Sequence, residues 1–502
     1  MTTTEVNPNI VFIVSDAARA RNFSLYGYDR DTTPFLEEFA EQSHVYENTI
    51  STSPWTVPSH ASMFTGLYTS KHGATRSNPS ISNHIPTLPK IFNKKGYSTH
   101  CLTANQLLTL ENGLNAGFDY TEIPTRLFPN DTDYSQIKSS FSSNGFSRTF
   151  VEDLAGFLWE EKDIKDASNL AYKFATKLLG TSIVGHRRRE PKGTNSIVNS
   201  FDSIVFGSDE PFFTYINLME THLKYIPDQG FLRQVAPPNH STSGYSDVNQ
   251  DPRLYNYANA VDMDDEDFAL LQSFYDGAVR QTDQAISEIV KSLNESGVLK
   301  DTLVVIVGDH GENIGDFGRM GHSLSLNDAV LRVPLIVSYP GDTGGERISE
   351  LVQTVDLFTT IDQVCNLGVS ESDEVGLDSQ PLPRTRDEQG RDYAVAEYLG
   401  SPFDGIQRVM EKYPEQDYSE LDFEIKTIYD SSARKLTIHS DGRERMSEVD
   451  INGEIPLHGD ELQDQEDLES KLFEIVEPFG TVGINSEYED SVRDTLRDLG
   501  YI

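Results

Sequence analysis

Two short apolar stretches, rich in valine and isoleucine, constrain the fold of this chain more than any other feature. They are Asn9–Asp16 (NIVFIVSD) and Asp301–Asp309 (DTLVVIVGD). Apolar runs of this kind are typical of strands buried on both faces, which occur in parallel sheets covered by helices. Both runs stop at a carboxylate, and the second continues into His310 and Gly311. Ligands of open α/β sheets bind beyond the carboxyl ends of the strands, so we expect an α/β fold with its functional groups at that edge.

The residues that end these strands could hold a metal ion. Asp16 and Asp309 offer hard oxygen ligands and His310 offers a borderline nitrogen, a combination that suits Mn²⁺, Zn²⁺ or Mg²⁺. An Asp-His pair also occurs where a strand merely ends in a turn, and on these two segments alone that alternative stays open.

A third segment, WTVPSHASMFTG, adds a hydroxyl group. Pro58 fits the first position of a helix that Gly66 would stop. Thr56 is then expected just before the helix N-terminus, where free N–H groups and the helix dipole favour an anion. A hydroxyl beside metal-binding carboxylates and a helix dipole is a candidate nucleophile. The alternative is a threonine that only caps the helix.

Four segments of the chain, taken in order, resemble the sulfatase branch of the alkaline phosphatase superfamily. They match the segments that carry a metal-binding Asp with an Arg, the nucleophile, a substrate-binding His, and a metal-binding strand with its following loop. These segments are Pro8–Tyr28, Thr32–Ala74, Pro211–Pro227 and Tyr275–Pro340. The resemblance implies a three-layer α/β/α, mostly parallel sheet of the alkaline phosphatase type, with a smaller C-terminal antiparallel α+β subdomain.

The same resemblance divides the chain into two parts. It implies a sulfatase-like catalytic domain over residues 8–370, with an insertion near 120–207 and a long loop near 237–264, and a smaller subdomain over 390–502. We predict one further helix of the main domain at Val355–Leu367. In the second part YAVAEYL, FEIKTIYD and RKLTIHS are interpreted as short strands, followed by acidic helices that end at Ile502.

The departures from the sulfatase pattern bear on the chemistry. Family sulfatases carry a Cys/Ser-x-Pro-x-Arg motif whose first residue becomes formylglycine, whereas this chain has Thr56 in that place and His60 in place of the Arg. Relatives with Thr at this position use its oxygen to bind the metal and to attack phosphorus directly. Many sulfatases also have a second Asp after the first strand, where this chain has Ala17.

The resemblance assigns roles to individual residues. It implies one divalent metal ion bound by Asp16, Thr56, Asp309 and His310. With one carboxylate fewer, the site favours Mn²⁺ or Zn²⁺ over Mg²⁺, and over Ca²⁺, which prefers six to eight oxygen ligands. Further catalytic roles fall to residues near the metal or the leaving oxygen, namely Arg19, His222 and His322.

Together these residues predict a metal-dependent sulfatase-like hydrolase. Metal-bound Thr56 would attack a sulfate ester, phosphoester or phosphonoester in line, with a phosphoester favoured, and His222 or His322 would protonate the leaving oxygen. The substrate is expected to be a small anionic ester, which could be glycan-linked. One alternative is a transferase that moves a phospho-alcohol group to a glycan or another polar acceptor. Another is a non-catalytic homologue that binds a metal or glycan.

The charge balance limits the partners of the chain. It holds 80 acidic and 41 basic residues, for a net charge of −39. Such a surface repels nucleic acid and anionic lipid headgroups, so neither is an expected partner. The composition resembles that of proteins from salt-in halophiles. The basic run His186–Arg189 could steer an anionic substrate, although a solvated turn is the favoured interpretation.

The location of the chain is predicted from apolar runs and cysteines. The N-terminus is polar, and no run of about 18 apolar residues occurs, so we expect a soluble, cytoplasmic protein. Cys101 and Cys365 lie in apolar surroundings and are expected to be buried free thiols rather than a disulfide. The oligomeric state is left open by the sequence.

Overall fold

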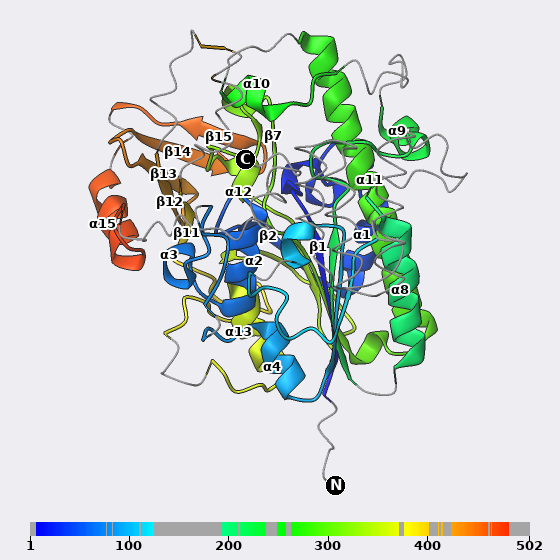
Figure 1. Ribbon diagram of the computed structural model, residues 1–502. Helices are drawn as coiled ribbons and strands as arrows, with labels where there is room; N and C mark the ends of the chain where they lie inside the picture. The colour runs from blue at the N-terminus through cyan, green and yellow to red at the C-terminus, as the bar shows by residue number, and fades with distance from the viewer. Residues whose placement is uncertain are drawn as a thin grey trace, which may run out of the picture.

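The computed structural model describes residues 7–124, 192–208, 211–236, 248–257, 263–370, 376–400 and 423–480, apart from a few isolated positions, together with 410, 413 and 414. Figure 1 shows a large central sheet with helices on both sides and a second sheet at one flank. The basic run at 186–189 lies outside the described residues, as does most of the insertion predicted near 120–207.

The central sheet has eight strands in the order β10-β2-β9-β6-β1-β5-β3-β4. Every neighbouring pair is parallel except those of β9, which is antiparallel to both β2 and β6. The mostly parallel α/β sheet predicted from the sequence is therefore confirmed. The strands are β1 (Asn9–Ser15), β2 (His44–Ile50), β3 (Ser98–Thr103), β4 (Tyr120–Glu122), β5 (Phe212–Leu218), β6 (Thr302–Gly308), β9 (Leu335–Ser338) and β10 (Arg347–Gln353).

The register of the central strands brings their carboxyl ends together. Ser15, the last residue of β1, lies opposite Gly308 of β6 on one side and Leu218 of β5 on the other. All seven residues of β5 and of β6 are buried, as the apolar runs predicted. The residues that directly follow these three strands must therefore share one edge of the sheet.

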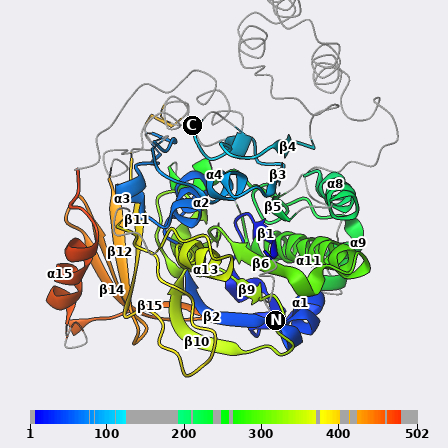
Figure 2. The same ribbon diagram turned by 90° about the horizontal axis from the view of Figure 1, so that it is seen from below.

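Helices cover both faces of this sheet and create two separate apolar cores (Figures 1 and 2). On one face lie α2 (Thr56–Thr65), α4 (Leu88–Lys94) and α13 (Asp356–Val364), the last of which confirms the helix predicted after Val355. The other face is covered by α1 (Pro34–Phe39), α8 (Thr194–Gly207), α9 (Gln229–Val235) and the long α11 (Asp265–Glu295). This is the expected three-layer arrangement.

The second sheet is antiparallel throughout and has the order β11-β12-β13-β14-β15. Helix α15 (Gln465–Ile475) packs on it, which confirms the smaller α+β part. Strands β14 and β15 were not predicted. The segment after RKLTIHS was interpreted as acidic helices, because β14 alternates charged and apolar side chains. The strands are β11 (Tyr393–Tyr398), β12 (Ile425–Asp430), β13 (Arg434–His439), β14 (Glu444–Asp450) and β15 (Gly453–Pro456).

Several short elements lie near the edge where the strands end. The loop predicted at 237–264 contains a one-turn helix, α10 (Pro252–Asn256), and parts of it lie outside the described residues. The remaining short elements are α3 (Thr69–His72), α12 (Asp328–Leu331), β7 (Asn313–Ile314) and β8 (Met320–Gly321). Both cysteines are buried free thiols, as predicted. Within the described residues, no helix has the length and apolar character needed to cross a membrane.

Candidate metal centre and active site

Three predicted ligands meet at the edge formed by β1 and β6. One ligand atom from each of Asp16, Asp309 and His310 lies within 4.8 Å of the other two. His310 Nε2 is 3.5 Å from Asp309 Oδ2 and 3.9 Å from Asp16 Oδ1. These three atoms are buried and form no hydrogen bond with any residue that the structure describes. Buried polar atoms are normally satisfied, so three orphaned atoms that face one another fit a bound cation.

The remaining polar atoms of the same side chains are held in place. Asp309 Oδ1 accepts hydrogen bonds from the backbone N–H of Ala17 at 3.1 Å and of His310 at 2.8 Å. His310 Nδ1 lies 2.8 Å from the carbonyl oxygen of Gly311, an acceptor, so Nδ1 carries the proton and Nε2 keeps its lone pair. The neighbouring groups thus fix the ligand atoms in the orientation that a metal requires.

Electrostatics also favours a cation between the two carboxylates. Burial and the negative charge of Asp16 raise the pKa of Asp309 well above its usual value. Burial also raises the pKa of Asp16, but the neighbouring His222 and His310 outweigh this effect and the net shift is downward. Two buried carboxylates this close are costly to ionise together, and a divalent ion would remove that cost.

Thr56 lies beside this group of ligands. It is fully buried and is the first residue of α2, so the helix begins two residues earlier than the expectation from Pro58. The N-cap residue is Trp55, and no side chain caps the helix, so nothing supports a purely capping role for the threonine. Asn105 Nδ2 lies 3.5 Å from Thr56 Oγ1 and 2.9 Å from Asp16 Oδ2. One amide group therefore bridges the hydroxyl and a metal ligand.

His60, which replaces the family Arg, supports the backbone of the candidate nucleophile. Its Nδ1 donates to the carbonyl oxygen of Thr56 at 2.7 Å, so its Nε2 accepts from the Tyr215 hydroxyl at 2.5 Å. Burial lowers the pKa of His60 to about 4, which keeps the ring neutral at pH 7. The ring also lies 3.6 Å from Asp309 Oδ2. His60 thus links the start of α2 to the ligand group.

The two predicted catalytic histidines lie next to the ligands. The ring centroids of His310 and His322 are 4.4 Å apart, and those of His222 and His322 are 5.2 Å apart. His322 Nδ1 is 2.9 Å from Glu312 Oε1, a pairing that the sequence analysis missed. Burial raises the pKa of Glu312 to about 7 and lowers that of His222 to about 4.

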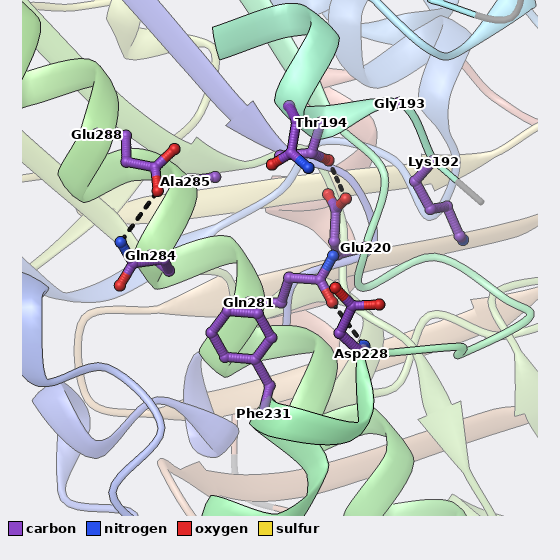
Figure 3. A pocket seen from close by; sticks show the side chains of 11 residues that line it. Lys192, Gly193, Thr194, Glu220, Asp228, Phe231, Gln281, Gln284, Ala285 and Glu288 are labelled. Carbon is purple, nitrogen blue, oxygen red and sulfur yellow. Dashed lines mark hydrogen bonds between the residues drawn. The ribbon is translucent and has the colours of Figure 1, made fainter. Parts of the chain in front are cut away.

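Behind His222 lies a polar cavity of about 90 Å³. Lys192 Nζ donates to the carbonyl oxygen of His222 at 2.6 Å, and burial lowers the pKa of this lysine to about 8. Figure 3 shows the Thr194 hydroxyl directed at Glu220, with which it forms a hydrogen bond. Lys192 belongs to the predicted insertion, and nothing in its sequence context indicated that it would reach the loop that carries His222.

Arg19 lies one step farther from the ligands. Its Nη1 donates to the Glu312 carbonyl oxygen at 3.0 Å and pairs with Asp316 at 3.0 Å. Its backbone N–H donates to the hydroxyl of Tyr275, over whose ring the guanidinium also packs. These contacts hold the loop that follows His310, and a direct catalytic part for Arg19 stays a prediction.

Comparisons with known proteins indicate the family of the chain. The family model described as Sulfatase matches residues 8–366. An arylsulfatase of Clostridium perfringens is 23% identical over 422 residues, which cover 78% of this chain and 82% of that protein. The chain spans only 64% of the length of the Bos taurus arylsulfatase K, to which it is 21% identical.

Solved structures show the same fold at low identity. The phosphonate monoester hydrolase of Agrobacterium radiobacter matches with a TM-score of 0.59 and 17% identity, covering 88% of each chain. BT4656, solved in complex with its substrate D-glucosamine-2-N,6-O-disulfate, matches with a TM-score of 0.63 and 15% identity, covering 93% of this chain and 97% of that one. The relatives bear the names of ester hydrolases, in agreement with the prediction of a sulfatase-like hydrolase. Since the family model spans well over half of its length, this chain belongs to the sulfatase family.

Proposed function

We propose that this protein is a metal-dependent hydrolase of phosphoesters, phosphonoesters or sulfate esters, with Thr56 as its nucleophile and phosphoesters as its preferred substrates. One observation carries the proposal. The hydroxyl of Thr56 shares the Asn105 amide with Asp16, at the rim of three buried and orphaned ligand atoms. A hydroxyl in this setting stands where a reacting phosphorus or sulfur atom could meet both the nucleophile and a cation.

The donor set supports one divalent ion, with Mn²⁺ or Zn²⁺ favoured. Asp16, Asp309 and His310 supply two oxygens and one nitrogen, and Thr56 Oγ1 is a suitable fourth ligand. When bound, such an ion lowers the pKa of a hydroxyl that it contacts and stabilises negative charge on the group being transferred.

The reaction follows from the placement of the side chains. Thr56 Oγ1 gives its proton to solvent and forms a bond to phosphorus or sulfur, while the bond from that atom to the leaving oxygen breaks. His222 or His322, which takes up a proton from solvent beforehand, gives it to the leaving oxygen. Water then cleaves the ester on Thr56: its oxygen bonds to phosphorus or sulfur, and one of its protons returns to Thr56 Oγ1. The N-terminus of α2 places its backbone N–H groups and dipole beside the group being transferred.

Phosphorus is favoured over sulfur because of the residue at position 56. Thr carries a methyl group on its β carbon, so oxidation cannot give the aldehyde on which formylglycine sulfatases depend. A threonine hydroxyl needs no prior modification to attack. Protein produced in a host without a formylglycine-generating enzyme should therefore be active.

The test replaces Thr56 and leaves the rest of α2 intact. Activity of the wild type, Thr56→Ala and Thr56→Ser is compared on aryl phosphate, aryl phosphodiester, phenylphosphonate ester and aryl sulfate at high salt with Mn²⁺. We expect Thr56→Ala to lower kcat at least about a thousandfold and Thr56→Ser to retain measurable turnover. Thr65→Ala, the same change at the other end of α2, serves as the control. Wild-type rates in Thr56→Ala would disprove the assignment of the nucleophile.

A further inference from the structure

A second pocket opens beside the two candidate proton donors. It has a volume of about 160 Å³, and His222 and His322 both lie in its wall. At roughly 30 Å³ for each water molecule of the liquid, it has room for a ring-sized organic group. Since these histidines protonate the leaving oxygen in the proposed reaction, the group that fills this pocket is the alcohol part of the ester.

The charge of the pocket is opposite to that of the protein. The chain as a whole has about two acidic residues for each basic one. Of the ten residues that line the pocket, two are cations, Lys224 and Arg253, and only Asp251 is an acid. Arg253 forms a two-point ion pair with Asp251, at 2.8 Å for both contacts. The exposed Lys224 forms no ion pair with any described residue, although it is close enough to Asp251 to contribute to the lowered pKa of that carboxyl, behind the hydrogen bonds from Arg253. With two cations in the lining and one acid, a net positive charge is left for a ligand.

Further cations stand directly behind the lining. The buried Arg76 donates to the Tyr398 hydroxyl at 3.0 Å and approaches Ser323, a lining residue, at 3.4 Å. Arg319 donates to the backbone carbonyl oxygen of Asn256 at 3.2 Å and, among the described residues, has no acidic partner.

These arginines lie around the short helix α10 and the segment that carries His322. Arg253 belongs to α10, Arg319 donates to the carbonyl oxygen of Asn256 in the same helix, and Arg76 reaches Ser323 beside His322. The acids of this region are Asp251 in the lining and Glu312, which pairs with His322. Cations therefore outnumber acids around the pocket, in a strongly acidic protein.

We propose that this pocket, lined by Lys224, Arg253 and Ser323, binds a second anionic group on the alcohol part of the substrate. The substrate class is then an ester of a ring-sized polar alcohol that also carries a carboxylate, sulfate or phosphate. A sugar unit with one further acidic substituent meets this description. This inference rests on the proposed function, since it takes the pocket to be the place of the leaving group.

A positive electrostatic potential at this pocket would favour binding of a substrate with two negative charges. The overall negative charge of the protein repels a doubly charged substrate, so binding requires a local reversal of the potential. A pocket whose lining has two cations and one acid provides this reversal and also discriminates against esters of neutral alcohols.

The experiment compares two esters that differ in one charge. The alcohol parts are 4-(carboxymethyl)phenol and its neutral amide, 4-(carbamoylmethyl)phenol, whose methylene group keeps the reacting oxygens almost equally acidic. Both are offered with the ester group that the wild type cleaves best. We expect kcat/KM to favour the anionic ester about fivefold or more, and added salt to reduce this preference. Sulfomethyl and phosphonomethyl analogues then show which acidic group fits best.

Variants at one exposed position test the pocket itself. Lys224→Gln is expected to bring the ratio of the two kcat/KM values close to one, and Lys224→Arg is expected to restore it. Arg233→Gln removes one positive charge from the exposed side of α9, outside the pocket, and should leave the ratio unchanged. A ratio near one in the wild type, or a ratio that Lys224→Gln does not change, would overturn the inference while the proposed function stands. A wild type that cleaves the parent aryl ester but neither of these two would also overturn the inference alone, whereas a wild type that cleaves none of the four ester classes would overturn both.

Discussion

Asp309 provides the sharpest test of the metal centre, because its carboxylate should destabilise the metal-free protein and stabilise the metal-bound one. The ligand atoms of Asp16 and Asp309 lie within 4.8 Å of each other and are fully buried. At an effective dielectric constant of about 20, two like charges at that separation repel by about 3 kcal/mol. We therefore expect Asp309→Asn, measured in a chelator, to unfold with a free energy equal to or above that of the wild type.

The geometry of the variant supports this expectation. Its amide oxygen can keep the two hydrogen bonds that Asp309 Oδ1 accepts from the backbone of Ala17 and His310. Its amide nitrogen would replace Oδ2, 3.5 Å from the His310 Nε2 lone pair, and could donate to it. The substitution thus removes a charge and leaves no additional polar atom unsatisfied.

A metal ion should reverse the order of stability. At a concentration of one hundred times its Kd, an ion that binds only the folded state adds about 2.7 kcal/mol to the free energy of unfolding. The wild type should gain this amount with Mn²⁺ or Zn²⁺, and Asp309→Asn should gain much less.

The pH dependence of the metal-free stability has a definite sign. Because the pKa of folded Asp309 is raised above its ordinary 3.8, its contribution to metal-free stability is present below that pH and is lost as the pH rises through the raised pKa.

The assay is unfolding by denaturant, followed by fluorescence or circular dichroism, with chelator or with Mn²⁺ at equal ionic strength. Asp276→Asn is the control, since Asp276 is a buried carboxylate that pairs with Arg30 at 2.6 Å, away from the ligand group. It should be destabilising to the same extent with and without metal. If Asp309→Asn also loses the same free energy under both conditions, Asp309 is only a structural residue and the argument for a cation fails.

Two further expectations follow from the same geometry and from the charge of the chain. Asn105→Ala removes the amide that joins Thr56 Oγ1 to Asp16, so kcat should fall about 10- to 100-fold at a temperature where the variant stays folded, since the change also takes the acceptor from the Leu107 N–H; unaltered kcat would show that the bridge has no catalytic part. The net charge of −39 predicts that the thermal midpoint rises as KCl goes from about 0.1 M to about 1 M, where the screening length shrinks from about 10 Å to about 3 Å. A midpoint that stays flat or falls would contradict the halophilic interpretation.

Sequence patterns predicted the site best where they could be combined with a rule about the whole sheet. Apolar strands that end in Asp16 and Asp309 must share an edge if the sheet is parallel, and the observed register of Ser15 with Gly308 places them there. Thr56 was identifiable because its segment resembles a known motif, although the helix start was expected at Pro58. The helix can begin at Thr56 because Pro58, its third residue, still lies in the first turn, where a backbone N–H would have no partner within the helix and its absence costs no hydrogen bond.

Other parts of the site carry no local signal. Asn105 is one polar residue two positions after β3, and only the pairing of β3 with β5 brings it to the edge of the sheet. Lys192 is distant from His222 in the sequence, and only the folded structure brings its ammonium group to the His222 carbonyl oxygen. The strands β14 and β15 have few apolar residues because one side of this part of the sheet is exposed, and alternation of charged residues does not distinguish such strands from a solvated helix.

The two departures from the sulfatase motif are connected through Asp309. Ala17, in place of a second Asp, donates its backbone N–H to one oxygen of this carboxylate, and the ring of His60, in place of an Arg, lies 3.6 Å from the other. Ala17 keeps a φ of 60°, a left-handed conformation that Asp adopts more readily than Ala, as expected if the backbone of the motif was retained while the side chain changed. The first departure removes one negative charge and the second removes one positive charge, since burial keeps His60 neutral. The two changes thus offset each other in charge, whereas either change alone would alter the charge of a buried site by a full unit, at a cost of several kcal/mol.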